Sequence, residues 1–191
     1  MKQGKIYLKN CAFFLLIAAV LLLLACKGQV GQVKQEPQLQ VAAGEQDLKV
    51  IYYGDRHNES RKEVNKRLKQ AMEGILAEEI SYVPIGEEIV IKAENFETEE
   101  FSITDYILKE NGEIRYDEKV AQTSVIPVND GAVSFPLPSH FAAFLSSDSE
   151  DYKPGKTIRG FVVRAEIDDA PFAFAFILRT DAEMVIETDN E

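Results

Sequence analysis

Residues 157–179 read TIRGFVVRAEIDDAPFAFAFILR, and this stretch decides the fold. Two runs rich in β-forming residues, 157–167 and 172–179, flank Asp168-Asp169, which indicates a turn. In the second run Phe172, Phe174 and Phe176 share one face, while Ala173, Ala175 and Ile177 occupy the other. Such a segment is typical of a central sandwich strand, because both of its faces are covered. The alternative is an exposed aromatic stripe that contacts glycans or peptides.

Shorter β-forming runs surround this pair, with turn signals about every ten residues. They cover residues 48–53, 88–95, 101–108, 114–120, 124–128, 132–135 and 183–187, and Asn111-Gly112 provides a strong hairpin turn. The pattern predicts a mainly β fold, an antiparallel β-sandwich of seven or more strands.

One helix is predicted before the sandwich, over residues 60–79. Ser60 and Glu63 form a capping box, and apolar residues then recur at spacings of three and four from Val64 to Leu76. Basic residues come first and acidic residues last, which opposes the helix dipole. The helix is therefore expected to depend on docking its apolar stripe onto the sandwich.

The N-terminus has the organisation of a secretory signal. Lys2, Lys5 and Lys9 precede an unbroken apolar run from Cys11 to Cys26. Sixteen helical residues rise only about 24 Å, whereas a membrane-spanning helix needs roughly 20 residues. Residues 1–25 are therefore predicted to be a signal peptide rather than part of the fold; the alternative is an uncleaved N-terminal anchor.

The end of this apolar run, Leu23-Leu24-Ala25-Cys26, resembles the lipobox of bacterial lipoproteins. The resemblance implies that Cys26 is the lipid attachment site: its thiol receives a diacylglycerol, and a dedicated peptidase cuts before it. It implies a palmitate-type membrane anchor and a protein held on the extracytoplasmic face of the cell membrane. Two acyl chains suffice for stable attachment, since each buried methylene contributes about 0.8 kcal/mol.

After Cys26, residues 27–47 are rich in glutamine and contain no aromatic residue. Residues 26–47 are therefore predicted to form the lipidated cysteine and a flexible tether. Residues 48–191 are predicted to form a single domain that includes the helix. The alternative for the tether region is a poorly formed first strand.

Charge and cysteine content limit the classes of partner. The chain has 21 basic and 32 acidic residues, and loss of the three N-terminal lysines leaves a net charge of −14. Such a surface repels phosphate backbones, so nucleic-acid binding is not expected. No cysteine follows Cys26, which excludes a disulfide within the mature domain.

Two stretches of the predicted sandwich resemble the telokin-like, immunoglobulin-type domains of secreted lipoproteins from Gram-positive bacteria. They are Ile89–Phe96, with Glu110-Asn111-Gly112 after it, and Tyr152–Val163, in which Pro154-Gly155 is a type II turn signal. The resemblance spans roughly residues 85–180 and implies an immunoglobulin-like fold. The helix at 60–79 and the Ala-Phe alternation near the end depart from that family.

Catalytic and metal-binding patterns are sparse. The two histidines, His57 and His140, belong to no ligand spacing and are interpreted as surface residues; we predict no catalytic residue and no enzymatic activity. Asp148, Glu150 and Asp151 form the densest oxygen cluster, a candidate calcium site whose alternative is a solvated acidic loop. No cofactor is expected.

The sequence therefore predicts a lipid-anchored, non-enzymatic binding module of the cell envelope, whose partner is an envelope protein or a wall component. An accessory solute-binding lipoprotein is the alternative, and an envelope hydrolase is a third hypothesis. Phe141, Phe144 and Leu145 are expected to plug the open end of the sandwich.

Overall fold

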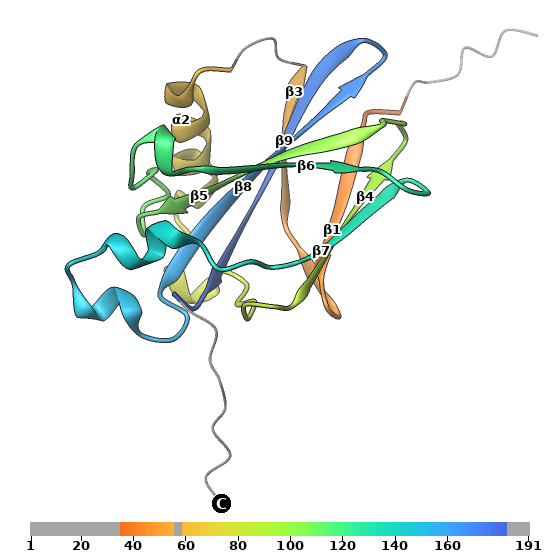
Figure 1. Ribbon diagram of the computed structural model, residues 1–191. Helices are drawn as coiled ribbons and strands as arrows, with labels where there is room; N and C mark the ends of the chain where they lie inside the picture. The colour runs from red at the N-terminus through yellow and green to blue at the C-terminus, as the bar shows by residue number, and fades with distance from the viewer. Residues whose placement is uncertain (1–34, 56–58, 183–191) are drawn as a thin grey trace, which may run out of the picture. The chain divides into compact units, whose positions relative to one another are not determined.

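The computed structural model describes residues 35–55 and 59–182 (Figure 1). The predicted signal peptide, Cys26, His57 and the predicted strand at 183–187 lie outside these ranges. Within the described ranges, no helix is long and apolar enough to cross a membrane.

Two antiparallel sheets build the domain. The first contains, in spatial order, β2 (Gln46–Leu48), β1 (Gln38–Ala43), β4 (Glu88–Glu94) and β7 (Ala132–Pro136). The second contains β3 (Val50–Asp55), β9 (Ala170–Thr180), β8 (Thr157–Ile167), β5 (Glu100–Leu108) and β6 (Gln122–Pro127). The prediction of a mainly β, antiparallel sandwich is confirmed.

The hairpin β8–β9 is the centre of the larger sheet. Its strands pair from Thr157↔Thr180 to Ile167↔Ala170, and Asp168 and Asp169 both have positive φ, 51° and 62°. Two residues with φ > 0 make a type I′ turn, whose twist matches that of the strands it joins. The turn predicted here is confirmed.

The two apolar faces of β9 have different partners. Phe174 and Phe176 are buried between the sheets, where the ring of Phe176 stacks on Phe161 at 4.7 Å. Ala173 and Ala175 face the opposite way and pack with residues of the helix. The central-strand prediction is therefore confirmed, and the alternative of an exposed aromatic stripe is wrong.

The helix α2 (Arg61–Met72) lies on the outer face of the larger sheet (Figure 1). Its capping box, Ser60 with Glu63, is formed as predicted, and Val64, Leu68 and Met72 are its buried stripe. The helix ends at Met72 rather than at residue 79, which corrects the prediction. The chain leaves the helical conformation at Glu73, whose ψ is 119°, and Gly74, with φ of +77°, completes a turn that the Ile75 N–H closes on Met72 O at 3.0 Å.

The predicted tether is wrong over residues 38–47, because these residues form β1 and most of β2. Leu39, Val41 and Ala43 are buried between the sheets, and β1 pairs with β4 from Gln38↔Glu94 to Ala43↔Ile89. The apolar residues alternate with polar ones at a period of two, which is a strand signal. The alternation covers only a few residues and lies within a glutamine-rich stretch, so the composition of that stretch favoured the tether prediction.

The predicted strand at 114–120 is also wrong, although the hairpin turn before it is confirmed. Gly112 has φ of +78° and donates its N–H to Lys109 O at 2.9 Å, and Leu108 and Ile114 form a bridge. The N–H of Ile114 is taken by the Asn65 side chain at 2.6 Å. The pairing with β5 does not continue beyond this bridge, and a 3₁₀ turn follows at Glu118–Val120.

The two ends of the sandwich carry different features. The chain enters the domain at Gln38, beside Glu94, and the β8–β9 turn lies at this same end (Figure 1). At the opposite end, Pro136 pairs with Glu88 and Thr157 with Thr180. The connection from β7 to β8, residues 137–156, therefore lies at the end remote from the point of chain entry.

Gly160 lies on β8 where Leu108 of β5 and Leu68 of the helix pack against it. A Cβ at this position would lie 2.9 Å from Cδ1 of Leu108 and 3.3 Å from Cδ2 of Leu68.

We expect Gly160→Val to lower the free energy of unfolding by about 1–3 kcal/mol through overpacking, and Gly160→Ala to have a stability between those of the valine variant and the wild type. Chemical denaturation measures this. Gln40→Val, on an exposed strand position, is the control, and an equal loss there would contradict the packing explanation.

Candidate interaction surface

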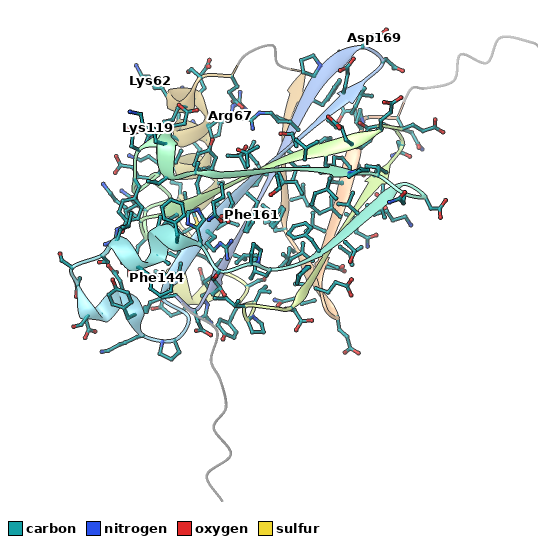
Figure 2. The ribbon with its side chains drawn as sticks, in the orientation of Figure 1. Lys62, Arg67, Lys119, Phe144, Phe161 and Asp169 are labelled. Carbon is teal, nitrogen blue, oxygen red and sulfur yellow. The ribbon has the colours of Figure 1, made fainter. Side chains whose placement is uncertain are left out.

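The connection between β7 and β8 is a folded excursion rather than a simple loop. Residues 137–156 contain two short 3₁₀ helices, Phe141–Leu145 and Ser149–Tyr152. Four large apolar side chains on it are exposed: Phe141 49%, Phe144 47%, Leu145 53% and Tyr152 41%. We call these four residues, three aromatic and one leucine, the aromatic patch; Figure 2 labels Phe144 within it. The expectation that Phe141, Phe144 and Leu145 plug the sandwich is wrong.

The small residues of the excursion face the domain in their place. Ala142 and Ala143 are buried against Ile107 and Ala182. A 3₁₀ helix has three residues per turn, so Phe141 and Phe144 fall on one side. Burying alanine while exposing phenylalanine reverses the usual preference. Large apolar side chains exposed together on one short segment make this segment a candidate interaction site.

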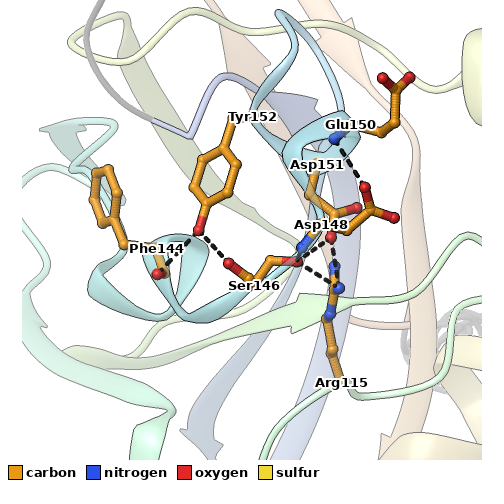
Figure 3. Close-up of polar contacts among 7 residues, drawn as sticks. All are labelled: Arg115, Phe144, Ser146, Asp148, Glu150, Asp151 and Tyr152. Carbon is orange, nitrogen blue, oxygen red and sulfur yellow. Dashed lines mark hydrogen bonds and ion pairs between the residues drawn. The ribbon is translucent and has the colours of Figure 1, made fainter.

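Polar contacts hold the patch in place (Figure 3). The Tyr152 hydroxyl lies 2.6 Å from Ser146 O and 3.0 Å from Phe144 O, which joins the two 3₁₀ helices. Arg115 pairs with the Asp151 carboxylate at 2.5 Å, and the Ser146 hydroxyl donates to the same carboxylate. The hydrogen bonds from Arg115 and Ser146 lower the pKa of Asp151. The excursion is thereby tied to the body of the domain.

The three carboxylates of the candidate calcium site have separate partners. Asp151 binds Arg115, Glu150 pairs with Lys153 at 2.6 Å, and Asp148 accepts the Glu150 N–H at 3.0 Å. Among the residues that the structure describes, no group of three or more acidic, histidine or cysteine side chains is arranged to hold a metal. The calcium interpretation therefore finds no converging set of oxygens, and the carboxylates serve as structural links.

A buried ion pair lies beneath the start of the excursion. Arg159 on β8 is 1% exposed, and its guanidinium contacts both carboxylate oxygens of Asp105 on β5, with Nε 3.2 Å from Oδ1. Its Nη1 donates to Pro138 O at 2.6 Å. Bidentate pairing fixes the guanidinium plane. The third contact therefore holds the backbone of the excursion against the sheet.

His140 is buried, 2% exposed, so its interpretation as a surface residue is wrong. Its Nδ1 accepts the Ala142 N–H at 3.1 Å, and its Nε2 lies 3.4 Å from Asp105 O. These contacts assign the proton to Nε2. Burial lowers the pKa of His140 and so favours the neutral ring. Both ring nitrogens face backbone atoms, so the histidine acts as a structural link rather than as a base for a serine.

The end of the excursion is fixed by a turn and a carboxylate. Pro154 and Gly155, with φ of +71° at the glycine, form the predicted type II turn, which the Lys156 N–H closes on Lys153 O at 3.1 Å. Asp181 accepts the Gly155 N–H at 2.7 Å and the Tyr82 hydroxyl at 2.6 Å. The hydrogen bond to Asp181 raises the pKa of Tyr82. Both ends of the excursion are thus pinned.

Surface hollows along the described part of the chain include the following four. The largest, about 1090 Å³, is a groove along α2 that includes Lys62, Lys66 and Lys69. Others are a hollow of about 610 Å³ beside Asp151, one of about 690 Å³ between Glu100 and Asp168, and a cleft of about 180 Å³. All four are open to solvent, whereas small-molecule sites usually bury most of their ligand.

The fold and the excursion together define a helix-covered β-sandwich with a supported apolar patch at one end. No protein-family model matches the chain, and neither the curated proteins nor the solved structures contain a match.

Sequence reasoning missed the residues that support the patch. Arg159 shares its strand face with Phe161, and Asp105 shares its face with Phe101 and Ile103, so both charges fall at inward positions of their strands. Charges at such positions are rarely buried unless paired. The inward position of both charges, two residues from buried apolar residues on their strands, could have predicted an internal ion pair. The contact of Arg115 with Asp151 depends on tertiary structure and has no such sequence signal.

The buried ion pair leads to a prediction about stability. Asp105→Asn leaves the Arg159 charge buried without its counter-ion, and we expect it to lower the free energy of unfolding by about 3–5 kcal/mol. The double variant Asp105→Leu/Arg159→Met removes both charges and is expected to lose less than the single variant. Urea denaturation measures both. A double variant less stable than the single one would contradict this account.

Proposed function

We propose that the protein is a lipid-anchored, extracytoplasmic lipoprotein whose domain binds a protein or wall component of the cell envelope without catalysing a reaction. The observation that carries the binding proposal is the aromatic patch, four large apolar side chains exposed on a pinned excursion. Aromatic side chains dominate the energetics of protein interfaces.

Preorganisation supports binding through this patch. Every side chain and loop that becomes ordered on binding costs conformational entropy and so weakens the affinity. Here Arg159, Asp181 and Arg115 already fix the backbone that carries the patch. The rigid support therefore lowers the cost of association.

The placement of the patch agrees with a membrane anchor at Cys26. The chain enters the domain at Gln38, at the end opposite the excursion. Residues 27–37 would separate the anchor from β1 and span at most about 36–40 Å when fully extended. A domain held at its entry end presents the patch away from the membrane, where an envelope partner has access to it.

The anchor is tested by metabolic labelling with palmitate. We expect wild-type protein to incorporate the label and Cys26→Ser to incorporate none, because the thiol accepts the lipid. Cys11→Ser is the matched control, since it removes the other cysteine of the chain and is expected to label normally. Unchanged labelling of Cys26→Ser would exclude the proposed attachment site.

The patch is tested by replacing Phe141 and Phe144 with serine. Both side chains are about half exposed, so we expect stability to change by less than about 1 kcal/mol while capture of envelope components falls at least about tenfold. Affinity capture on the wild type and the variant, followed by mass spectrometry and muropeptide analysis, measures this. Leu76→Ser, which removes a 65% exposed leucine elsewhere, is the control. Equal capture by the double variant would refute the patch as the binding site.

A further inference from the structure

The edges of the two sheets differ in how well they are protected. Among the described strands, β2 is a three-residue edge and β3 carries a bulge between Tyr52 and Gly54. Short edges and bulges are devices that prevent pairing with another chain. The other two edges, β6 and β7, carry no charged residue and no register shift. They belong to different sheets and are joined by a short turn, from which they diverge (Figure 1).

The edge β6 offers unpaired backbone groups. Val128 donates its N–H to Glu99 O at 2.8 Å, and hydrogen-bonded pairs alternate along an antiparallel ladder. Ile126, Ser124 and Gln122 therefore bond to β5, while the N–H and C=O groups of Thr123 and Val125 point away from the sheet. Both residues are exposed, and β6 has no second neighbouring strand among those described. On β7 the same alternation leaves Ser134 as its outward donor, because Pro136 has no N–H.

A cleft lies directly beside this edge. It has a volume of about 180 Å³, and most of its walls are apolar, among them Ile103, Ile126, Phe135 and Phe161. Asp105, Gln122 and Ser124 are its polar lining residues. Side chains of a strand added to β6 would alternate between the two faces of the sheet. Those opposite Ser124 and Ile126 would enter the cleft, which has room for side chains of the size of valine or leucine.

Charge distinguishes the two ends of the edge. At the Pro127 end, Glu100 is the paired residue of β5. Next to it lies a hollow of about 690 Å³ with a single basic residue, Arg164, and six carboxylates: Glu97, Glu99, Glu100, Glu166, Asp168 and Asp169. A basic residue at this end of an added strand would be attracted to these carboxylates.

We infer that β6 is a docking edge for an extended segment of a partner protein, which pairs with Thr123 and Val125, inserts alternate apolar side chains into the cleft, and carries a basic residue at the Glu100 end. This is β-strand addition, in which main-chain bonds supply affinity and pockets supply sequence preference. The site is distinct from the aromatic patch. A second copy of the chain fits the edge less well, because two domains of net charge −14 repel each other.

The test is selection of random 12-residue peptides displayed on phage against the full chain in detergent micelles. We expect the enriched peptides to alternate apolar residues and to carry lysine or arginine at one end. Their affinities are then measured for the wild type, Val125→Pro and Val125→Thr. The proline removes the outward N–H without touching the β5 ladder, so binding is expected to weaken by about tenfold or more. The threonine keeps this N–H, and its binding is expected to stay within about twofold.

Two further measurements separate a lost site from a lost fold. Amide hydrogen exchange should show new protection at Thr123 and Val125 when peptide is bound. The amides of Ser124 and Ile126 should stay protected in Val125→Pro, because they bond to β5. Glu100→Lys is expected to weaken the binding of peptides that have a basic end and to leave the binding of other peptides unchanged.

Four results would overturn the inference: no enriched peptide, equal binding to the proline and threonine variants, peptide-induced protection elsewhere, or self-association of the wild type through β6. The last result would assign the edge to a second copy. Each of them leaves the palmitate and patch experiments unaffected, so this inference and the proposed function can fail separately.

Discussion

The hairpin β8–β9 has no polar face in the middle of its strands, and the remaining architecture follows from covering it on both sides. The smaller sheet covers Phe161, Phe174 and Phe176, and α2 covers Val162, Ala173 and Ala175. On the helix side, the small residues Gly160, Ala173 and Ala175 lie beside the larger Val162 and allow α2 to approach the sheet backbone. Gly160 leaves no room for a Cβ, with Leu68 and Leu108 against it. The helix is stabilised by docking its apolar stripe, because most helical stability in proteins comes from packing of an apolar face.

A second constraint is the buried pair of Asp105 and Arg159. Moving two charges out of water is costly, and apolar residues of similar size would often serve stability equally well. The guanidinium has a third role here, because it also binds Pro138 O and so sets where the chain leaves the sheet. His140 adds two contacts to backbone atoms at the same place. The polar cluster therefore determines the position of the excursion, and the excursion determines which side chains are exposed on it.

The sequence predicted the elements whose signals are local. The bounds of β8, the type I′ and type II turns, the cap of α2 and the two-sided burial of β9 all follow from residue pattern. Errors arose where tertiary contacts compete with local preference. Ile114 makes a single bridge to Leu108 before the chain turns into a 3₁₀ helix, and pairing with β4 turns the predicted tether into β1. The patch was located in sequence but assigned the wrong exposure, because only the folded structure shows that Ala142 and Ala143 face inward.

The entry of the chain through β1 has a mechanical consequence under the proposed anchoring. A load between a lipid at the N-terminus and a partner on the excursion would act roughly along the strands, since these two points lie at opposite ends of the sandwich. Along that direction the ladder between β1 and β4, from Gln38↔Glu94 to Ala43↔Ile89, is pulled in shear, so its hydrogen bonds share the force instead of opening one after another. The strand β1, which joins the domain to the anchored segment, would then resist being pulled out of its sheet. A force applied to the partner would be transmitted to the anchor before the hydrogen bonds between β1 and β4 break.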